Sequence, residues 1–493
     1  MIVAMISCTG MGWSQAPLPV VREWTSTDGR TLTAEYLGVQ GVNVLLKLPN
    51  GKVTPVALAK FSAADNAYVK KNHLTYREEW RAWPAAVEMS TSSVQVREVR
   101  EDGGNFVYTT DHFRFRTDVN LGTVLMKDIA RVFELTHDLH AKSPFGILAA
   151  PVGGAYQAQL YGTKQKYLQG GGPANTAGVY QLKDKRFLAP LELMGVESGA
   201  SGWRKASKQE YDTSTIIHEL THMLTHDMIN DLPTWFSEGY AEYIAHIPIE
   251  KGTFKISGEK IKQGVVAVLM RDLDRSSARP HPGSSSAKNN PALNPPAKKK
   301  PTDPENSNLK RSVELIRVAN MLTMTDKNWA SEPSRAGQPY TLTVPGRPAN
   351  ADYVQLMQKR YRTAHLILYY FIQLEGAQGV AKTRKVLDDN RRYLAQFTEY
   401  QANFKSYQEQ LIQFRKQPGV KDLPDGRIQY PMSLTPPKAP EPPFTDPNTL
   451  RMGGLKALLN GETPEVVGQR IEAALRKDLN LNLQFADDGT RPG

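Results

Sequence analysis

Residues 214–246 constrain the fold of this chain more than any other stretch, because they predict two consecutive helices. In the first, apolar residues recur at helical spacing, and Asp212 or Ser214 is placed to cap its start. A polar break containing Pro233 follows, and Thr234 can cap the second helix. The apolar residues of the two expected helices are Ile216, Ile217, Leu220, Met223, Leu224, Trp235, Phe236, Tyr240, Ala241 and Ile244.

The first of these helices carries the motif His-Glu-x-x-His. Residues four apart on a helix lie about 40° apart around its axis and about 6 Å apart along it. The imidazoles of His218 and His222 can therefore converge on one tetrahedral cation, with Glu219 beside it. A carboxylate in that position can take a proton from water and pass it to a leaving amine. The motif thus predicts zinc-dependent hydrolysis of peptide bonds.

The second helix offers two carboxylates, because Glu238 and Glu242 lie one turn apart on the side opposite its apolar face. The alternative is an ordinary amphipathic helix pair with hydrogen-bonded histidines and solvated glutamates. His226 continues the histidine stripe by one more turn, too far along the axis to bind the same ion. We expect it to support the site from behind or to lie at the surface.

The run from His218-Glu219-x-x-His222 to Leu232-Pro-Thr-Trp-Phe-Ser-Glu238-Gly-Tyr-Ala-Glu242-Tyr resembles the peptidase-MA-like domains of bacteria, which are gluzincin metallopeptidases. The resemblance covers about residues 105–275 and helices near 350–375. It implies that His218, His222 and Glu238 bind Zn²⁺, that Glu219 is the general base, and that Glu242 orients a ligating histidine. Candidates for an oxyanion partner, by residue type alone, are Tyr240, Tyr361, His365 and Tyr369.

Residues 20–72 predict a compact β module, with alternating apolar residues such as Leu32, Ala34 and Tyr36 and turns at 27–30 and 49–51. The pattern resembles the Sla-one homology domain, a small SH3-like barrel that recognises short peptide motifs in adaptor proteins. The alternative is a structural spacer without a ligand.

The whole chain predicts an α+β protein: a small SH3-like β-barrel, a gluzincin-like zinc metallopeptidase domain and a helical C-terminal part. Before the histidine helix we expect a helix at about 121–141 and a strand at 147–152. The glycine-rich residues 170–173 and the following 177–180 predict either an edge strand that pairs with a substrate backbone or a surface loop followed by an ordinary strand. The expected segments are a signal peptide at 1–16, the Sla-one homology domain at 20–72, a charged connection at 73–104, the catalytic domain at 105–275, a disordered insertion at 276–308, a helical continuation of the catalytic domain at 309–415, a Pro-rich linker at 416–448 and a C-terminal helical segment at 449–493.

The net charge of +11 does not indicate nucleic-acid binding, because part of the excess lies in the lysine run at 298–300 and no aromatic-basic motif accompanies it. The mostly apolar residues 2–13, with the small residues Ser14 and Ala16 at the −3 and −1 positions of a cleavage site, predict a secreted or periplasmic protein. Cys8, the only cysteine, lies in this leader, and a lipoprotein anchored there is the alternative. The longest later apolar run, at 366–372, is too short for a membrane span.

The expected partners are therefore a peptide or protein substrate and, for the N-terminal barrel, a short peptide motif. The rival function is a peptide-binding or scaffold protein with a structural or vestigial zinc site. Glu219 argues against it, because a structural site needs no carboxylate beside its ligands and usually has four protein ligands that include cysteine. Metal-assisted hydrolysis of a non-peptide bond is a third reading.

Overall fold

The computed structural model describes residues 21–40, 42–50, 52–71, 83–100, 104–174, 176, 178–200, 202–206, 213–229, 231–277, 312–331, 351–423, 427–442 and 455–487. The protein is mixed α and β, and the chain divides into two compact units. The first unit comprises residues 1–78 and 385–454, and the second comprises 79–384 and 455–493. The expected leader at 1–16 and almost all of the insertion at 276–308 lie outside the described residues.

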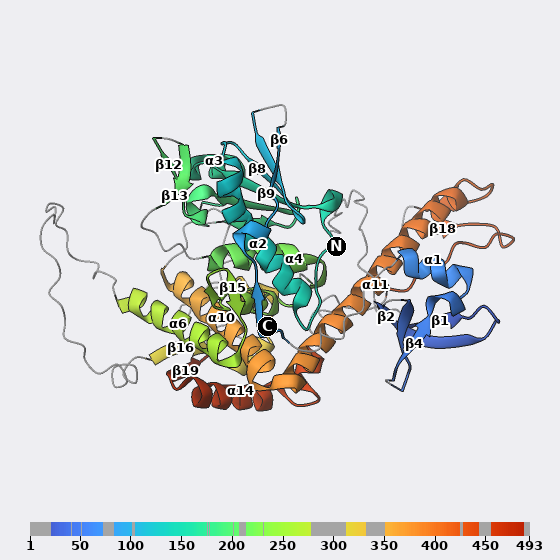
Figure 1. Cartoon of the computed structure of the whole chain (residues 1–493). Coiled ribbons are helices and arrows are strands. Elements are labelled where there is room, and N and C mark those ends of the chain that lie inside the picture. The colour runs from blue at the N-terminus through green and yellow to red at the C-terminus, as the bar shows by residue number, and fades with distance from the viewer. Residues whose placement is uncertain are drawn as a thin grey trace, which may run out of the picture. The chain divides into compact units, whose positions relative to one another are not determined.

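The first unit contains a four-stranded antiparallel sheet in the order β1-β2-β3-β4, drawn in blue in Figure 1. Its core gathers Trp24, Tyr36 and Phe61, and the Trp24 indole N–H donates to the Ala34 carbonyl at 3.0 Å. Helix α1 begins where Ser62 accepts a hydrogen bond from the Asp65 amide. The elements are β1 Val21–Thr25, β2 Thr31–Gln40, β3 Asn43–Lys47, β4 Val53–Ala57 and α1 Ala63–Lys71.

The small barrel expected at 20–72 is not closed among the described strands, because β1 and β4 do not pair. A 3-10 turn at Leu58–Lys60 redirects the chain directly after β4. The residues after that turn bind the end of β1 instead, through the Ser26–Phe61 bridge and a 2.8 Å bond from the Ser62 amide to the Thr25 carbonyl. The sheet is therefore open.

The second unit is built on a six-stranded sheet in the order β10-β11-β9-β8-β7-β6. The pairs β8–β9 and β9–β11 are parallel and the other neighbours are antiparallel. Helices α2 and α4 share one apolar core with this sheet. The elements up to α4 are β5 Ala86–Glu88, β6 Arg97–Arg100, β7 Phe106–Thr109, β8 Phe113–Thr117, α2 Gly122–Lys142, β9 Tyr156–Tyr161, α3 Lys164–Gln169, β10 Val179–Gln181, β11 Arg186–Pro190, β12 Val196–Gly199 and β13 Gly202–Lys205.

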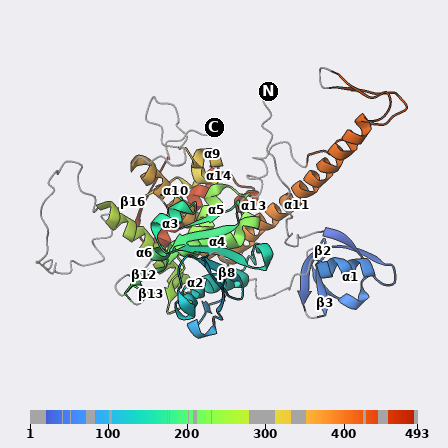
Figure 2. The ribbon, with the colours of Figure 1, turned by 90° about the horizontal axis from the view of Figure 1, so that it is seen from above.

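A helical layer follows the sheet. Figure 1 shows α4 beneath the sheet and then α10 and α14, and in Figure 2 α4 and α5 lie side by side. The C-terminal segment is part of this layer, because β16 and β19 pair in parallel and α14 packs on α8. The elements are α4 Ser214–Ile229, α5 Thr234–Ala245, β14 Ile249–Glu250, β15 Thr253–Lys255, α6 Gly258–Ser277, β16 Ser312–Ile316, α8 Val318–Leu322, α9 Asp326–Trp329, α10 Ala351–Tyr369, α13 Lys456–Leu459, α14 Pro464–Leu479 and β19 Asn482–Ala486.

A π-helical turn at Tyr370–Leu374 joins α10 to α11, which spans Gly376–Arg415 and contributes to both units. Within the expected Pro-rich linker, β17 (Lys421–Asp422) and β18 (Ile428–Gln429) form a two-stranded pair. No described helix combines the length and the apolar character that crossing a membrane requires.

Two local expectations about strands were wrong. Residues 147–152 form no strand, because the chain there runs along α4, where the Ala149 amide donates to the Leu224 carbonyl at 2.6 Å. The strand forms later, as β9. The charged segment at 73–104 was expected to be a simple connection, yet it supplies β5 and β6, each of which pairs with a later strand.

Candidate metal centre

Helices α4 and α5 place the histidines and glutamates of the motif on facing surfaces. The apolar side of α4, including Ile216, Leu220 and Met223, is buried in the core shared with the sheet. His218 and His222 therefore lie on the side toward α5. Their side chains keep only 13% and 21% of their surface exposed.

The start of α5 is fixed by a residue distant in sequence. Thr234 was expected to cap this helix, but it is the first helical residue and its own side chain does not cap it. Instead, Asp326 of α9 accepts hydrogen bonds from the Thr234 amide at 2.9 Å and from its hydroxyl at 2.7 Å. A carboxylate at a helix N-terminus satisfies an orphan amide and complements the helix dipole. Asp326 thus anchors the helix that carries Glu238.

Three donor atoms converge between the two helices. His218 Nε2 lies 3.1 Å from His222 Nε2 and 3.2 Å from Glu238 Oε2, and His222 Nε2 lies 3.5 Å from the same oxygen. Tetrahedral zinc holds such ligands at about 2.0–2.2 Å, which separates neighbouring ligand atoms by about 3.3–3.5 Å. The donor types are those that zinc takes, and their separations lie close to the spacing expected around a zinc ion.

His218 Nε2, His222 Nε2 and Glu238 Oε2 form a triangle, here called the donor triangle, and Glu242 lies behind it. Its Oε1 is 3.0 Å from His218 Nδ1, the ring nitrogen that faces away from Glu238, and its Oε2 is 3.2 Å from His246 Nδ1. The His246 ring stacks on His365, with centroids 5.3 Å apart. Glu242 is thus placed to fix the orientation of the His218 ring, and His246 and His365 form a further layer that the sequence did not indicate.

Opposite charges hold this cluster together. Burial by itself lowers the pKa of His218, but hydrogen bonds with Glu238 and Glu242 outweigh burial and hold the pKa well above its usual value. Burial raises the pKa of Glu242, yet His218 and His246 bring it down to about 2. The pKa of Glu238 is likewise lowered, because the nearby His222 and His218 outweigh its burial. Two ionised carboxylates thus surround the histidines, an arrangement that favours a cation.

Glu219 lies beside the donor triangle and bonds to the sheet. Its Oε2 accepts a 2.8 Å hydrogen bond from the Tyr180 amide of β10. Strand β10 is the edge strand at this end of the sheet, and Tyr180 lies opposite Phe187 of β11. The glycine-rich stretch at 170–173 precedes this edge strand, and the strand contacts the candidate base directly.

Helix α10 closes the other side of the site by a very near approach to α5. A methyl group added at Gly239 would lie 2.6 Å from the Ala364 carbonyl oxygen, so the absence of a side chain in Glu238-Gly239 permits this contact. Tyr361, one turn before Ala364, has its ring centroid 6.3 Å from that of His218. The pKa of the Tyr361 hydroxyl is well above its usual value, because it is buried and faces the charges of Glu238, Glu242 and Glu219.

The other three oxyanion candidates lie elsewhere. Tyr240 is buried on the opposite side of α5, with its ring 5.8 Å from that of Phe145. His365 belongs to the layer behind Glu242, and burial lowers its pKa to about 3. The Tyr369 hydroxyl donates to Asp478 of α14 at 2.8 Å. Of the four, only Tyr361 faces the donor triangle.

His226 lies at the far end of α4. It is buried rather than at the surface, and its Nδ1 lies 3.0 Å from the Tyr180 hydroxyl. Its Nε2 lies 2.7 Å from Asp227 Oδ1. Tyr180 is therefore held to α4 twice, through its amide at Glu219 and through its hydroxyl at His226. Helical spacing in the sequence placed His226 on the same face as His218 and His222. The hydrogen bond between His226 and Tyr180 of the edge strand could be found only from the tertiary structure.

Comparisons of the chain with models of protein families, with curated proteins and with solved structures found no match.

Proposed function

We propose that the second unit is a zinc-dependent peptidase of gluzincin type, in which His218, His222 and Glu238 hold the ion. The observation that supports the proposal most is the convergence of three donor atoms at separations of 3.1–3.5 Å. When bound there, a zinc ion would supply Lewis acidity that activates water and polarises a carbonyl group. The two histidines and one carboxylate also match the donor types of catalytic zinc sites, which keep a position open.

Glu219 is the general base in this proposal. Its Oε2 is held by the Tyr180 amide, so the carboxylate has a fixed position beside the ion without being one of its ligands. It accepts the proton of the attacking water and transfers it to the leaving amine. The Tyr361 hydroxyl is the proposed oxyanion donor, because its ring lies beside that of His218, with the centroids 6.3 Å apart.

The proposed substrate is an extended peptide or protein segment. Strand β10 supplies a sheet edge next to Glu219, and an extended chain can add to such an edge through backbone hydrogen bonds. The same pairing would bring a peptide carbonyl toward the donor triangle. An edge of this kind favours a peptide over a small non-peptide ester or amide.

Zinc content and cleavage of a peptide library test the proposal together. We expect about one zinc per chain in the wild-type protein. Glu219→Gln is expected to retain the ion and to lose cleavage by about 10²- to 10⁴-fold, since the amide keeps the shape but removes the base. Glu197→Gln is the matched control, because that exposed side chain of β12 pairs with Arg204 away from the donor triangle.

Three outcomes separate the alternatives. Equal cleavage by wild type and Glu219→Gln would remove Glu219 from the mechanism. Absence of zinc after reconstitution would remove the metal site. Bound zinc with no cleavage of any peptide, and with no binding of a hydroxamate that chelates an open zinc position, would favour a binding or scaffold protein with a structural zinc.

We also propose that the first unit is an SH3-like module of Sla-one homology type that binds a short peptide motif. The antiparallel strands followed by a 3-10 turn support this assignment. A peptide array probed with the full chain tests it. Export of the protein, with cleavage after residue 16 or lipid attachment at Cys8, likewise remains a proposal, and mass spectrometry of the mature N-terminus would decide between the two.

A further inference from the structure

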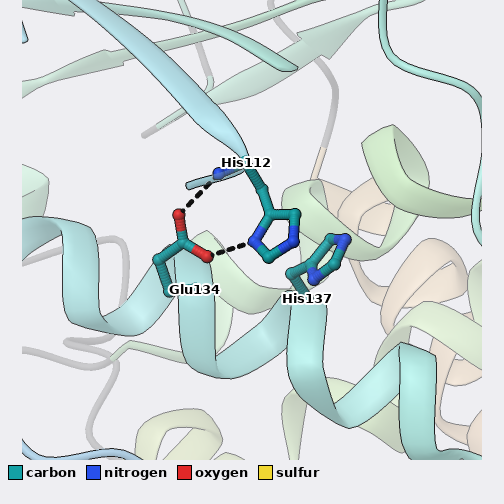
Figure 3. Close-up of side chains that lie close together, drawn as sticks. All are labelled: His112, Glu134 and His137. Carbon is teal, nitrogen blue, oxygen red and sulfur yellow. Dashed lines mark hydrogen bonds and ion pairs between the residues drawn. The ribbon is translucent and has the colours of Figure 1, made fainter. Parts of the chain in front are cut away.

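A second histidine–glutamate cluster lies outside the candidate metal centre. Figure 3 shows its members, His112 in the turn between β7 and β8 and the residues Glu134 and His137 of α2. Glu134 and His137 are three residues apart, a spacing that places two side chains on the same face of a helix. One imidazole from a turn thus meets a carboxylate and an imidazole from a helix.

Direct contacts already hold the three side chains together. His112 Nδ1 lies 2.6 Å from Glu134 Oε2, and the His112 amide donates to Glu134 Oε1 at 3.0 Å. The His112 and His137 rings stack, with centroids 3.7 Å apart and planes inclined by 21°. One ligand atom from each of the three residues can be chosen so that all lie within 4.8 Å of one another.

The surroundings of this cluster are acidic. Glu134 keeps only 7% of its side-chain surface exposed, so its carboxylate is nearly buried. Asp111 and Asp138 also act on His112, and with Glu134 they raise its pKa even though burial opposes the shift. Asp138 is partly neutralised by Lys142 at 2.7 Å. Burial and the charge of His112 lower the pKa of His137 to about 4.

A cavity of about 30 Å³ adjoins the cluster, and Glu134, Asp111 and Thr110 are among the residues that line it. A cavity of this size can hold a water molecule when polar groups surround it. Of the three proposed ligands, Glu134 lines this cavity, so a water held in it would contact the Glu134 carboxylate.

We propose that His112, Glu134 and His137 form a second binding site, for a divalent first-row transition-metal ion such as Zn²⁺. Two imidazoles and one carboxylate are donors that suit zinc, copper and nickel better than magnesium or calcium. The ion replaces the proton between His112 and Glu134, and water supplies the remaining ligand. The site is independent of the proposed peptidase activity.

Binding requires a local rearrangement. The stacked rings must turn so that one nitrogen of each points at the ion, and the ligand atoms must approach to about 3.3 Å. His112 can make this movement, because 44% of its side-chain surface is exposed and it lies in a turn. The cost of unstacking the rings makes this site weaker than the one between α4 and α5.

Titration of Zn²⁺ into the full chain carrying His218→Ala and His222→Ala tests the proposal, since that background removes the other centre. Competition with a chromogenic chelator is expected to show about one remaining equivalent. Adding His137→Ala is expected to weaken this binding by about tenfold or more, because one of three protein ligands is lost. Asp138→Asn is the matched control, since it removes a neighbouring charge but no ligand and should change the affinity less than threefold.

Circular dichroism establishes that each variant is folded, and His112→Gln replaces His137→Ala if the latter unfolds. The proposal is overturned if the folded background takes up no Zn²⁺, or if loss of either histidine leaves the affinity unchanged. An effect of Asp138→Asn equal to that of His137→Ala would also overturn it, because the ion would then be held by charge alone.

Discussion

The cluster between α4 and α5 and the cluster around His112 contain similar donors but differ in how far those donors are organised. Between α4 and α5 the three donor atoms already lie 3.1–3.5 Å apart, whereas around His112 one imidazole nitrogen is hydrogen-bonded to Glu134 at 2.6 Å and the two imidazole rings are stacked on each other. The first cluster is fixed by two regular helices, and the second depends on a turn. A metal site on rigid elements loses little free energy to reorganisation.

The clusters also differ in what lies behind them. Glu242 supports His218, and His246 and His365 follow it in a further layer. The second cluster has the His112 amide and a small cavity next to Glu134. Supporting residues of this kind hold a ligand in the orientation that binding requires. The comparison therefore predicts tight binding at the first cluster and weaker binding at the second.

The largest effect is expected from removing the carboxylate that faces both histidines. Glu238→Ala should abolish tight zinc binding, because only two imidazoles remain between α4 and α5. Competition titration with a chromogenic chelator measures the loss. If zinc remained bound as tightly as before, the third ligand would be Glu242 instead.

Tyr361→Phe should leave zinc bound and reduce the rate of peptide cleavage by about 10²- to 10³-fold, the usual cost of one oxyanion donor. Tyr369→Phe is the control, because the Tyr369 hydroxyl is hydrogen-bonded to Asp478 of α14 and does not face the donor triangle. Equal rates in the two variants would argue against a role for Tyr361.

Glu242→Ala should weaken zinc binding by about 10- to 100-fold, the range found when a supporting residue is lost, while the donor triangle stays complete. The same titration measures it. A loss larger than that caused by Glu238→Ala would exchange the roles of the two glutamates.

Gly239→Ala tests whether the first cluster depends on the close approach of α10. The added methyl would meet the Ala364 carbonyl oxygen at 2.6 Å, so we expect a loss of about 1–3 kcal/mol in the free energy of unfolding. Urea unfolding measures this loss. Gly258→Ala is the control, since its methyl would meet only Gln373 Oε1, at 3.7 Å, and unchanged stability in both variants would contradict the packing argument.

The smallest effect concerns the second cluster without metal. The His112–Glu134 pair should stabilise the fold by at most about 1 kcal/mol, because His112 is 44% exposed and solvent screens the interaction. The pKa of His112 is raised, so its contribution is complete below its usual 6.5 and is lost as pH rises through the higher value. The pKa of Glu134 is lowered, so its contribution is complete above its usual 4.5 and is lost on acidification.

The difference in unfolding free energy between wild type and His112→Ala should therefore be largest between pH 4.5 and 6.5 in chelator-treated protein. Urea unfolding at several pH values measures it. A difference that keeps growing above this window would mean that His112 acts through packing rather than charge.

Local periodicity was enough to predict several elements. The spacing of apolar residues predicted α2, α4 and α5. Helical geometry then places His218 near His222 and Glu238 near Glu242, because each pair lies four residues apart within a single helix. Strands were harder to predict: 147–152 is held by α4 and forms none, while β5 and β6 come from a charged segment that long-range pairing stabilises.

The sequence by itself thus determined which residues share a helix face. It thereby identified His218, His222 and Glu238 as the candidate donors of the metal centre. Tertiary structure decided everything that depends on the distance between elements: the Tyr180 amide at Glu219, Asp326 at the start of α5, and Tyr361 rather than three other candidates at the donor triangle. It also brought His112 to Glu134, 22 residues apart in the chain. Such contacts arise from the packing of whole elements, and packing leaves no periodic signal in the chain.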